Sequence, residues 1–488
     1  MPRSGWRTTS GGSRRLERAS AGPAARETSA ETPSMIASAR RARDRVVGEA
    51  RCIGLAENSP SPRRTRPRKA TPAAATDRSP RGALAGPCRC RPRSRMATPG
   101  MVRVSCGGSR LPDGADAARE LAMQAGRGLG RERARAAVFF ATSDHGPSLG
   151  RFEMAIRAAT GAAAIVGCSA SGVLWPGGEA ERGPAVTALA IAGDFEVRRF
   201  FLPGLRGRAD EVGREIGREA SMLERGPRTI LLLADSYALA PDELLAGIEG
   251  IAPDAVVIGA GASESGQTGE TRVVAGGRCA SDAVAGLVLG GVRVRTTVSL
   301  SCAIVGGWRT VTSCSGNRIL ALDGEPALPV YLECLPASLR EELRDGLRAT
   351  LAALAPPGDA VAASDSWFVR PVIGADPRDD SLLVGDEVLP GTRFAIAVRD
   401  AAVAREGLDA DLERLRTGGP GLAGALYFAG AERGESLFGH PDVESAYLAR
   451  GLGETPLAGL FCGAEFAPRG GRNRFHQHAG VLVGLERG

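Results

Sequence analysis

A unit of strand, helix, strand, small-residue turn and returning strand recurs along the chain. It limits the possible folds more than any other feature of the sequence. The first copy runs from Ala137 to Gly193, the second from Ile230 to Gly291, and a more diverged third from Ala425 to Leu485. Because one unit cannot bury both faces of its strands, the copies must stack against one another.

The order of elements within a unit predicts the fold class. Strand–helix–strand segments imply parallel strand pairs with right-handed crossovers, and the returning strands add antiparallel neighbours. The prediction is an α/β fold of mixed sheets with covering helices, with two packed sheets suiting the chain length. Glu196–Leu202 is expected to pair beside the return Ala185–Gly193.

A different pattern separates the second and third copies. A pair of strands is expected at Arg309–Leu322, single strands at Trp367–Ile373, Leu382–Val384 and Arg393–Arg399, and helices at Pro326–Leu335 and Ser338–Leu354. The unit pattern breaks at Val305-Gly306-Gly307. We therefore expect two packed domains, at residues 101–305 and 306–488.

Residues 1–100 differ from the rest in charge. They hold 21 Arg and Lys69 against 7 acidic residues, whereas the remaining chain has 40 basic and 48 acidic residues. This Arg/Pro-rich stretch has too little apolar content to form a core and is expected to be a disordered extension, or the product of a start codon assigned too early. Without interleaved aromatic residues it is not expected to bind nucleic acid.

Residue usage excludes several functions. Lys69 is the only lysine, so no P-loop, kinase or Schiff-base lysine lies after it. No apolar run is long enough to cross a membrane, and no targeting segment is recognised. The ten cysteines have neither zinc-ligand nor disulfide-framework spacing, which favours a reducing cytoplasm.

The turns that end each unit's second strand are the candidate ligand site. They carry Ser169 and Ser171, then Ser263 and Glu264, then Glu465. Hydroxyls and exposed amide groups at strand ends can hold a small ligand. Arg370, which interrupts an apolar strand, is expected to hold a ligand carboxylate, and Glu465 or Glu264 an amine. The alternatives are tight turns that need small residues only for packing, and a structural ion pair for Arg370.

Two other chemistries remain open. Cys168 or Ser169 could be the nucleophile of a hydrolase if one of the four histidines, His145, His440, His476 and His478, approached it. His476 and His478 are two residues apart, which on a strand would put both rings on one face, toward a metal ion or a haem iron. No third ligand with a diagnostic spacing accompanies them, so no metal or cofactor is expected, and no catalytic signature is found.

The motifs taken together resemble a known family. Val166–Val173 and the following Pro184–Gly193 are similar to the FIST N-terminal domain, and Phe368–Asp376, Gly391–Asp400 and Leu457–Asn473 are similar to the FIST C-terminal domain. The stretch Gly316–Tyr331 is similar to the segment that joins them. The resemblance covers roughly residues 115–486.

The resemblance implies an intracellular sensory module for small ligands, with amino acids proposed, acting in signal transduction. Some members resemble haem-based gas sensors. No output domain is left over here, so the signal would pass to a separate partner protein. Two family segments depart from the expected pattern: Ala429–Arg433 lacks the cysteine, and Gly463–Phe466 reads Gly-Ala-Glu-Phe.

Overall fold

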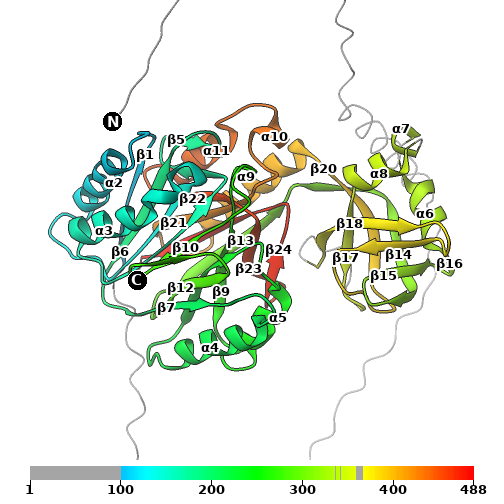
Figure 1. The fold of residues 1–488 in the computed structure, drawn as a ribbon, viewed down its shortest axis with the longest axis horizontal. Coiled ribbons are helices and arrows are strands. Elements are labelled where there is room, and N and C mark those ends of the chain that lie inside the picture. The colour runs from blue at the N-terminus through cyan, green and yellow to red at the C-terminus, as the bar shows by residue number, and fades with distance from the viewer. Residues whose placement is uncertain (1–100, 336, 341, 359–365, 488) are drawn as a thin grey trace, which may run out of the picture. The chain divides into compact units, whose positions relative to one another are not determined.

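The structure is a computed structural model that describes residues 101–487 except 336, 341 and 359–365 (Figure 1). The predicted extension at residues 1–100 lies outside the described residues. The elements form three consecutive units, which we call units 1, 2 and 3, and a barrel inserted into unit 3.

Unit 1 spans residues 103–192. It consists of β1 (Arg103–Ser109), α2 (Gly114–Leu129), β2 (Ala136–Thr142), the 3-10 helix η1 (Ser143–Ser148), α3 (Leu149–Thr160), β3 (Ala164–Ala170), the hairpin β4 (Gly172–Trp175) and β5 (Gly178–Ala180), and β6 (Val186–Ala192). The carboxylate of Asp113 accepts the N–H groups of Ala115 and Asp116, which fixes where α2 begins.

Unit 2 spans residues 196–290. It consists of β7 (Glu196–Pro203), α4 (Ala209–Ser221), β8 (Arg228–Asp235), α5 (Pro241–Glu249), β9 (Val256–Ala262), the hairpin β10 (Val273–Ala275) and β11 (Arg278–Ala280), and β12 (Ala283–Gly290). Its elements follow in the same order as those of unit 1.

Unit 3 is split by the barrel. It consists of β13 (Val294–Leu300), α9 (Ala401–Thr417), β21 (Leu422–Gly430), α10 (Glu435–Phe438), α11 (Val443–Leu452), β22 (Leu457–Cys462), the hairpin β23 (Ala464–Arg469) and β24 (Arg472–His476), and β25 (Ala479–Glu486). The barrel connects to unit 3 through Ser301 on one side and Asp400, the N-cap of α9, on the other.

The three units build three mixed sheets with one shared strand order. The sheets run β1-β6-β2-β3-β10-β11, then β7-β12-β8-β9-β23-β24, then β13-β25-β21-β22-β4-β5. In each sheet, the strand that returns at the end of the unit (β6, β12 or β25) is followed by two strands that run parallel to each other. The hairpin at the edge of the sheet comes from a different unit. This exchange ties the units together. We predict that the units superpose strand for strand.

The central strand of each unit is buried on both faces. In β2, Val138 and Phe140 point into a core common to all three sheets, while Phe139 packs against α2 and α3. The same alternation divides β8 and β21 between the common core and an outer helix layer, formed by α4 and α5 or by α9 and α11. The predicted α/β class with mixed sheets and covering helices is therefore confirmed.

The barrel is a seven-stranded antiparallel sheet closed by an additional β14–β15 pairing. It consists of β14 (Cys302–Ser315), β15 (Arg318–Leu322), β16 (Glu325–Pro326), α6 (Ala327–Cys334), α7 (Ala337–Arg340), α8 (Leu343–Ala349), β17 (Leu351–Ala355), β18 (Phe368–Asp376), β19 (Ser381–Val384) and β20 (Arg393–Arg399). The predicted boundary at 305–306 falls inside β14, where the pairing with β20 shifts register. The division into two domains there stays a prediction.

Three expectations need correction. Glu196–Leu202 does not pair beside β6; it lies in β7, the first strand of unit 2, and pairs with β12. The predicted helix Ser338–Leu354 ends early, because the buried run Leu351–Ala355 is the barrel strand β17; such a short apolar run has no period that separates strand from helix. The described residues form four sheets rather than two.

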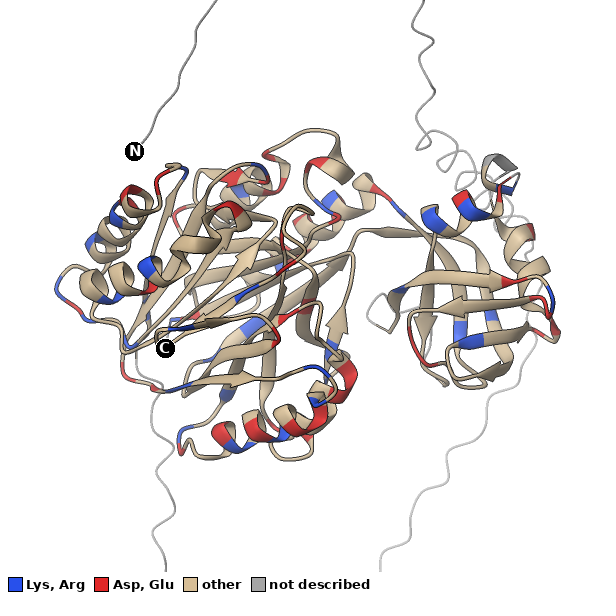
Figure 2. Cartoon of the chain, viewed as in Figure 1, with Lys and Arg blue, Asp and Glu red and all other residues tan. Residues whose placement is uncertain are grey.

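Charged residues occur mostly in helices and connecting segments, with α4 and α5 as clear examples, while the central strands contain few (Figure 2). Within the described part of the chain, no helix has both the length and the apolar character needed to cross a bilayer.

Candidate functional site

The three small-residue turns meet one another. Ser171 and Ser263 both donate their hydroxyl hydrogen to the carbonyl oxygen of Phe461, at 3.1 and 2.6 Å. The N–H of Ser171 donates to the Ser263 hydroxyl at 2.8 Å, and the N–H of Ser263 donates to the Ser169 carbonyl at 3.2 Å. The predicted turn residues of units 1 and 2 therefore lie together beside the end of β22, with their hydroxyls engaged by backbone groups.

Glu264 forms hydrogen bonds mainly within its own loop. Its carboxylate accepts hydrogen bonds from the Tyr237 hydroxyl at 3.0 Å and from the N–H groups of Gln267 and Thr268. These contacts occupy both oxygens, and the structure does not bring Glu264 into contact with Ser169, Ser171 or Glu465.

Arg370 has an acidic partner in the barrel. Its side chain on β18 is buried, and Nε donates to Asp386 Oδ2 at 2.8 Å. The guanidinium also lies over the rings of Phe368 and Phe475, at 4.4 and 4.7 Å. Asp386 thus supplies the negative charge that a buried guanidinium needs. A contact between Arg370 and a ligand stays a prediction.

Glu465, one of the predicted site residues, is buried with a carboxyl oxygen that has no hydrogen-bond partner. It lies in β23, is 1% exposed, and its Oε2 has no hydrogen-bond partner. The Cys462 thiol lies 3.7 Å from Oε1. Burial, followed by the nearby charge of Glu432, raises the pKa of Glu465 well above its ordinary value. A buried carboxyl with a free oxygen is costly unless something binds it.

A second carboxyl faces Glu465 across Gly430, the last residue of β21. A Cβ atom on Gly430 would lie 2.9 Å from Glu432 Oε2 and 3.1 Å from Glu465 Oε1. The His478 Nδ1 atom lies 3.9 Å from Glu432 Oε2. Since the Glu432 side chain is 41% exposed, this cluster reaches solvent. We call Glu432, Glu465 and His478 the acidic site.

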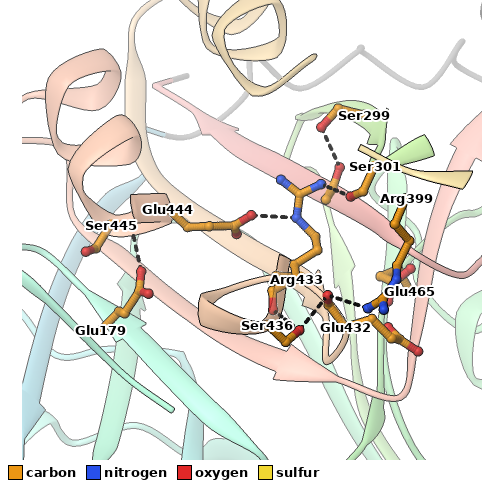
Figure 3. Close-up of polar contacts among 12 residues, drawn as sticks. Glu179, Ser299, Ser301, Arg399, Glu432, Arg433, Ser436, Glu444, Ser445 and Glu465 are labelled. Atoms are coloured by element: carbon orange, nitrogen blue, oxygen red, sulfur yellow. Dashed lines mark hydrogen bonds and ion pairs between the residues drawn. The ribbon is translucent and has the colours of Figure 1, made fainter. Parts of the chain in front are cut away.

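A buried ion pair fixes the segment that carries Glu432. Arg433 Nε donates to Glu444 Oε1 at 2.5 Å, and Nη1 donates to the Ser301 hydroxyl at 2.5 Å; neither Arg433 nor Glu444 is exposed (Figure 3). Ser301 also donates its N–H to the His478 carbonyl at 2.9 Å. The acidic site is therefore anchored to the chain segment that leads into the barrel.

Arg399 brings a positive charge to the same place. It is the last residue of β20, it is exposed, and its Nη1 donates to the backbone carbonyl of Glu432 at 3.5 Å. Figure 3 shows its side chain extending toward Glu432 from the barrel side. A long hydrogen bond to one carbonyl leaves most of the five guanidinium donors for another acceptor. Neither Arg399 nor Glu432 was among the predicted site residues.

The hydrolase alternative gains no support from the geometry. Cys168 is fully buried, and burial raises the pKa of its thiol far above the ordinary value, so little thiolate forms. The Ser169 hydroxyl accepts the N–H of Arg272 at 3.0 Å. Among the described residues, no hydrogen bond joins either side chain to a histidine.

The paired-histidine expectation rested on a continuous strand, and that premise is wrong. His476 ends β24, whereas His478 has a left-handed backbone with φ of 54°. His476 is fully buried, its Nε2 lies 3.1 Å from the Ala467 carbonyl, and burial followed by the charge of Arg469 lowers its pKa to about 3. No group of three His, Cys, Asp or Glu side chains suited to a metal ion occurs in the described residues.

A depression of about 150 Å³ lies elsewhere on unit 3. Its lining residues come from α9, α11, the start of β21 and the adjoining segments, and include Leu412, Leu422, Leu452 and Arg416. It contains no acidic side chain, so it offers nothing to bind an ammonium group.

Comparison with known proteins gives matches over most of the chain. Residues 135–325 match the FIST N domain and residues 327–468 match the FIST C domain. An uncharacterized protein of Mycobacterium tuberculosis is 29% identical over 384 residues, which cover 77% of this chain and 97% of that protein. One of Mycobacterium bovis is 30% identical over 384 residues, 77% and 96% of the two chains. An F-box/LRR-repeat protein of Arabidopsis thaliana is 32% identical over 105 residues, 20% of each chain.

Proposed function

The chain belongs to the FIST domain family, and from this premise we propose that it is a sensory protein that binds an amino acid at the acidic site. FIST domains are sensory domains that bind small ligands in signal transduction. The family supplies the class of activity, and the residues of the acidic site supply the chemistry of the ligand.

The unpartnered oxygen of Glu465 carries the proposal. Oε2 is buried without a hydrogen-bond donor, and the Glu432 carboxylate stands across Gly430. Two carboxylates confined to so small a volume repel each other when both are ionised. A ligand ammonium group would supply donors to both and remove that repulsion.

Arg399 is the candidate contact for the ligand carboxylate. Its guanidinium approaches Glu432 from the barrel side, so positive and negative groups lie a short distance apart. An α-amino acid likewise carries an ammonium and a carboxylate group, attached to the same carbon. Guanidinium groups bind carboxylates through two parallel hydrogen bonds, which would orient the ligand.

The proposal includes a separate output protein and a cytoplasmic location. All seven cysteines within the described residues, including the exposed Cys279, are free thiols, which fits a reducing compartment. A signal would leave through the barrel, because Arg399 and Ser301 join it to the acidic site.

A thermal-shift screen tests the proposal. The twenty amino acids would be compared with the matching 2-hydroxy acids, which keep the carboxylate and side chain but lack the amine. We expect at least one amino acid to raise the melting temperature, with stabilisation of about 2.7 kcal/mol at roughly 100 times its dissociation constant. An equal effect of the 2-hydroxy acid, or no effect of any amino acid, would contradict it.

A further inference from the structure

The three central strands end at equivalent positions with different residues. The last parallel pairs are Thr142 with Ala170, Asp235 with Ala262, and Gly430 with Cys462. In every unit, the return strand pairs with the other edge of the central strand. The end of the central strand can therefore be compared directly among units 1, 2 and 3.

In units 1 and 2 the side chain at this position closes the strand end. The Thr142 hydroxyl accepts the N–H of Ala185 at 2.9 Å. The Asp235 carboxylate accepts the N–H of Asp282 at 2.6 Å and the hydroxyl hydrogen of Thr271 at 2.5 Å. Both side chains are buried. Internal partners thus satisfy the polar groups at these two ends and leave nothing for a ligand.

Gly430 leaves the corresponding position in unit 3 without a side chain. Its backbone is not in the left-handed region, so the conformation does not require glycine. The space above its Cα is instead occupied by Glu432 Oε2 and Glu465 Oε1, which lie 2.9 and 3.1 Å from the position that a Cβ would take. The unpartnered Glu465 Oε2 lies on the same carboxyl group.

We infer that Gly430 is the specificity-determining residue that confines ammonium binding to unit 3. Glycine lets the two carboxylates converge on one cation. A side chain at this position would separate them, as Thr142 and Asp235 fill the equivalent space in the other units. The inference rests on the proposed function, because it concerns the same acidic site.

The test compares Gly430→Ala with Gly374→Ala. Both glycines lie in strands outside the left-handed region, and a Cβ on Gly374 would contact nothing within 4 Å. Calorimetric titration with the amino acid that stabilises the wild type gives the dissociation constant. We expect Gly430→Ala to weaken binding roughly tenfold or more, the effect of losing one charge-assisted hydrogen bond, and Gly374→Ala to leave it unchanged.

If Gly430→Ala is less stable than the wild type, each titration is carried out below the melting temperature of the variant, so that the affinities of folded proteins are compared. Replacing Gly430 by Thr, the residue at the end of β2, should weaken binding further. Wild-type affinity in Gly430→Ala overturns this inference and leaves the proposed function standing. If no amino acid binds the wild type, the proposed function itself is wrong, and the inference falls with it.

Discussion

Glu432 and Glu465 each direct one carboxylate oxygen to the space above the Cα of Gly430, 2.9 and 3.1 Å from the position of an added Cβ. The two residues reach this point from different elements, Glu432 from the segment after β21 and Glu465 from β23. Because Glu465 is buried and Glu432 is partly exposed, their environments differ although their oxygens are close. This asymmetry leads to the first predictions.

Replacing Glu465 with Gln should stabilise the free protein and abolish the response to ligand. The amide carries no charge, so the variant loses the desolvation cost and the repulsion from Glu432. We expect a gain on the order of 1–3 kcal/mol at neutral pH, measured by chemical denaturation. Glu406→Gln, on the exposed face of α9, is the matched control and should change neither quantity. A loss of stability in Glu465→Gln would show that the carboxylate is needed structurally.

Ligand binding should strengthen as the pH rises. The pKa of Glu465 lies above its ordinary value, so at low pH the carboxyl is protonated and cannot pair with an ammonium ion. Raising the pH through that pKa ionises the group, and binding then releases a proton. The dissociation constant of the wild type, measured by calorimetry between about pH 5 and about pH 8, should therefore fall as the pH rises. A constant value in the wild type would exclude Glu465 from the ammonium contact.

Arg399→Gln should remove the preference for a carboxylate. The wild type is expected to bind the amino acid more tightly than its amide, because only the acid pairs with the guanidinium. In the variant the two ligands should bind with similar affinity, and the amide should bind both proteins alike. Arg378→Gln, which removes an exposed guanidinium that pairs with Asp376 in the barrel, is the control. If Arg399→Gln retains the full preference, another cation holds the carboxylate.

Some of this architecture is readable from the sequence because burial leaves a strong pattern. The strand and helix of each unit, such as Ala137–Thr142 and Leu149–Thr160, have an apolar pattern that predicts them well. The helices α2, α4 and α9 are not among the predicted elements, although Asp113 and Asp400 give two of them a recognisable N-cap. The exchange of hairpins between units has no local signature, since it depends on which sheet edge is free.

The site was harder to predict than the fold. Glu465 is a sequence candidate because it lies at the third small-residue turn, where a carboxylate can hold a ligand amine, and the structure buries it with one oxygen that has no hydrogen-bond partner. Glu432 could have been found from its position just after the buried strand ending at Gly430. Arg370 is a sequence candidate because it interrupts an apolar strand, but that pattern alone cannot show that Asp386 lies beside it.

The buried pair Arg433–Glu444 should be essential for folding. Neither residue is exposed, and the pair also holds the Ser301 hydroxyl. Arg433→Met would leave the Glu444 carboxylate buried without its partner, which costs about 3–5 kcal/mol. Arg416→Met breaks the exposed pair with Glu413 and should cost no more than about 1 kcal/mol. Denaturation midpoints measure both effects, and a similar small effect for the two would show that Glu444 finds another donor.

Glu179 should make stability decrease with rising pH. It lies on β5, is 2% exposed, and accepts the N–H groups of Asp442 and Ser445 at the start of α11, each at 2.9 Å. Burial raises its pKa to about 7, with the charges of Glu444 and Glu181 adding to the rise and the Ser445 N–H opposing it. The folded state therefore holds a proton that the unfolded chain, with a pKa near 4.3, has already released.

Between those two values the folded protein binds more protons than the unfolded chain, so its contribution to stability is present at low pH and is lost as the pH rises toward 7. Each unit of the difference is worth about 1.4 kcal/mol. In Glu179→Gln the neutral amide does not titrate, so its free energy of unfolding should gain on that of the wild type as the pH rises from about 4.5 to about 7. Urea denaturation at a series of pH values, with Glu406→Gln as the exposed control, measures that difference. Parallel curves for Glu179→Gln and the wild type would mean that Glu179 is already ionised throughout this range, and that the α11 N–H groups hold its charge more strongly than burial opposes it.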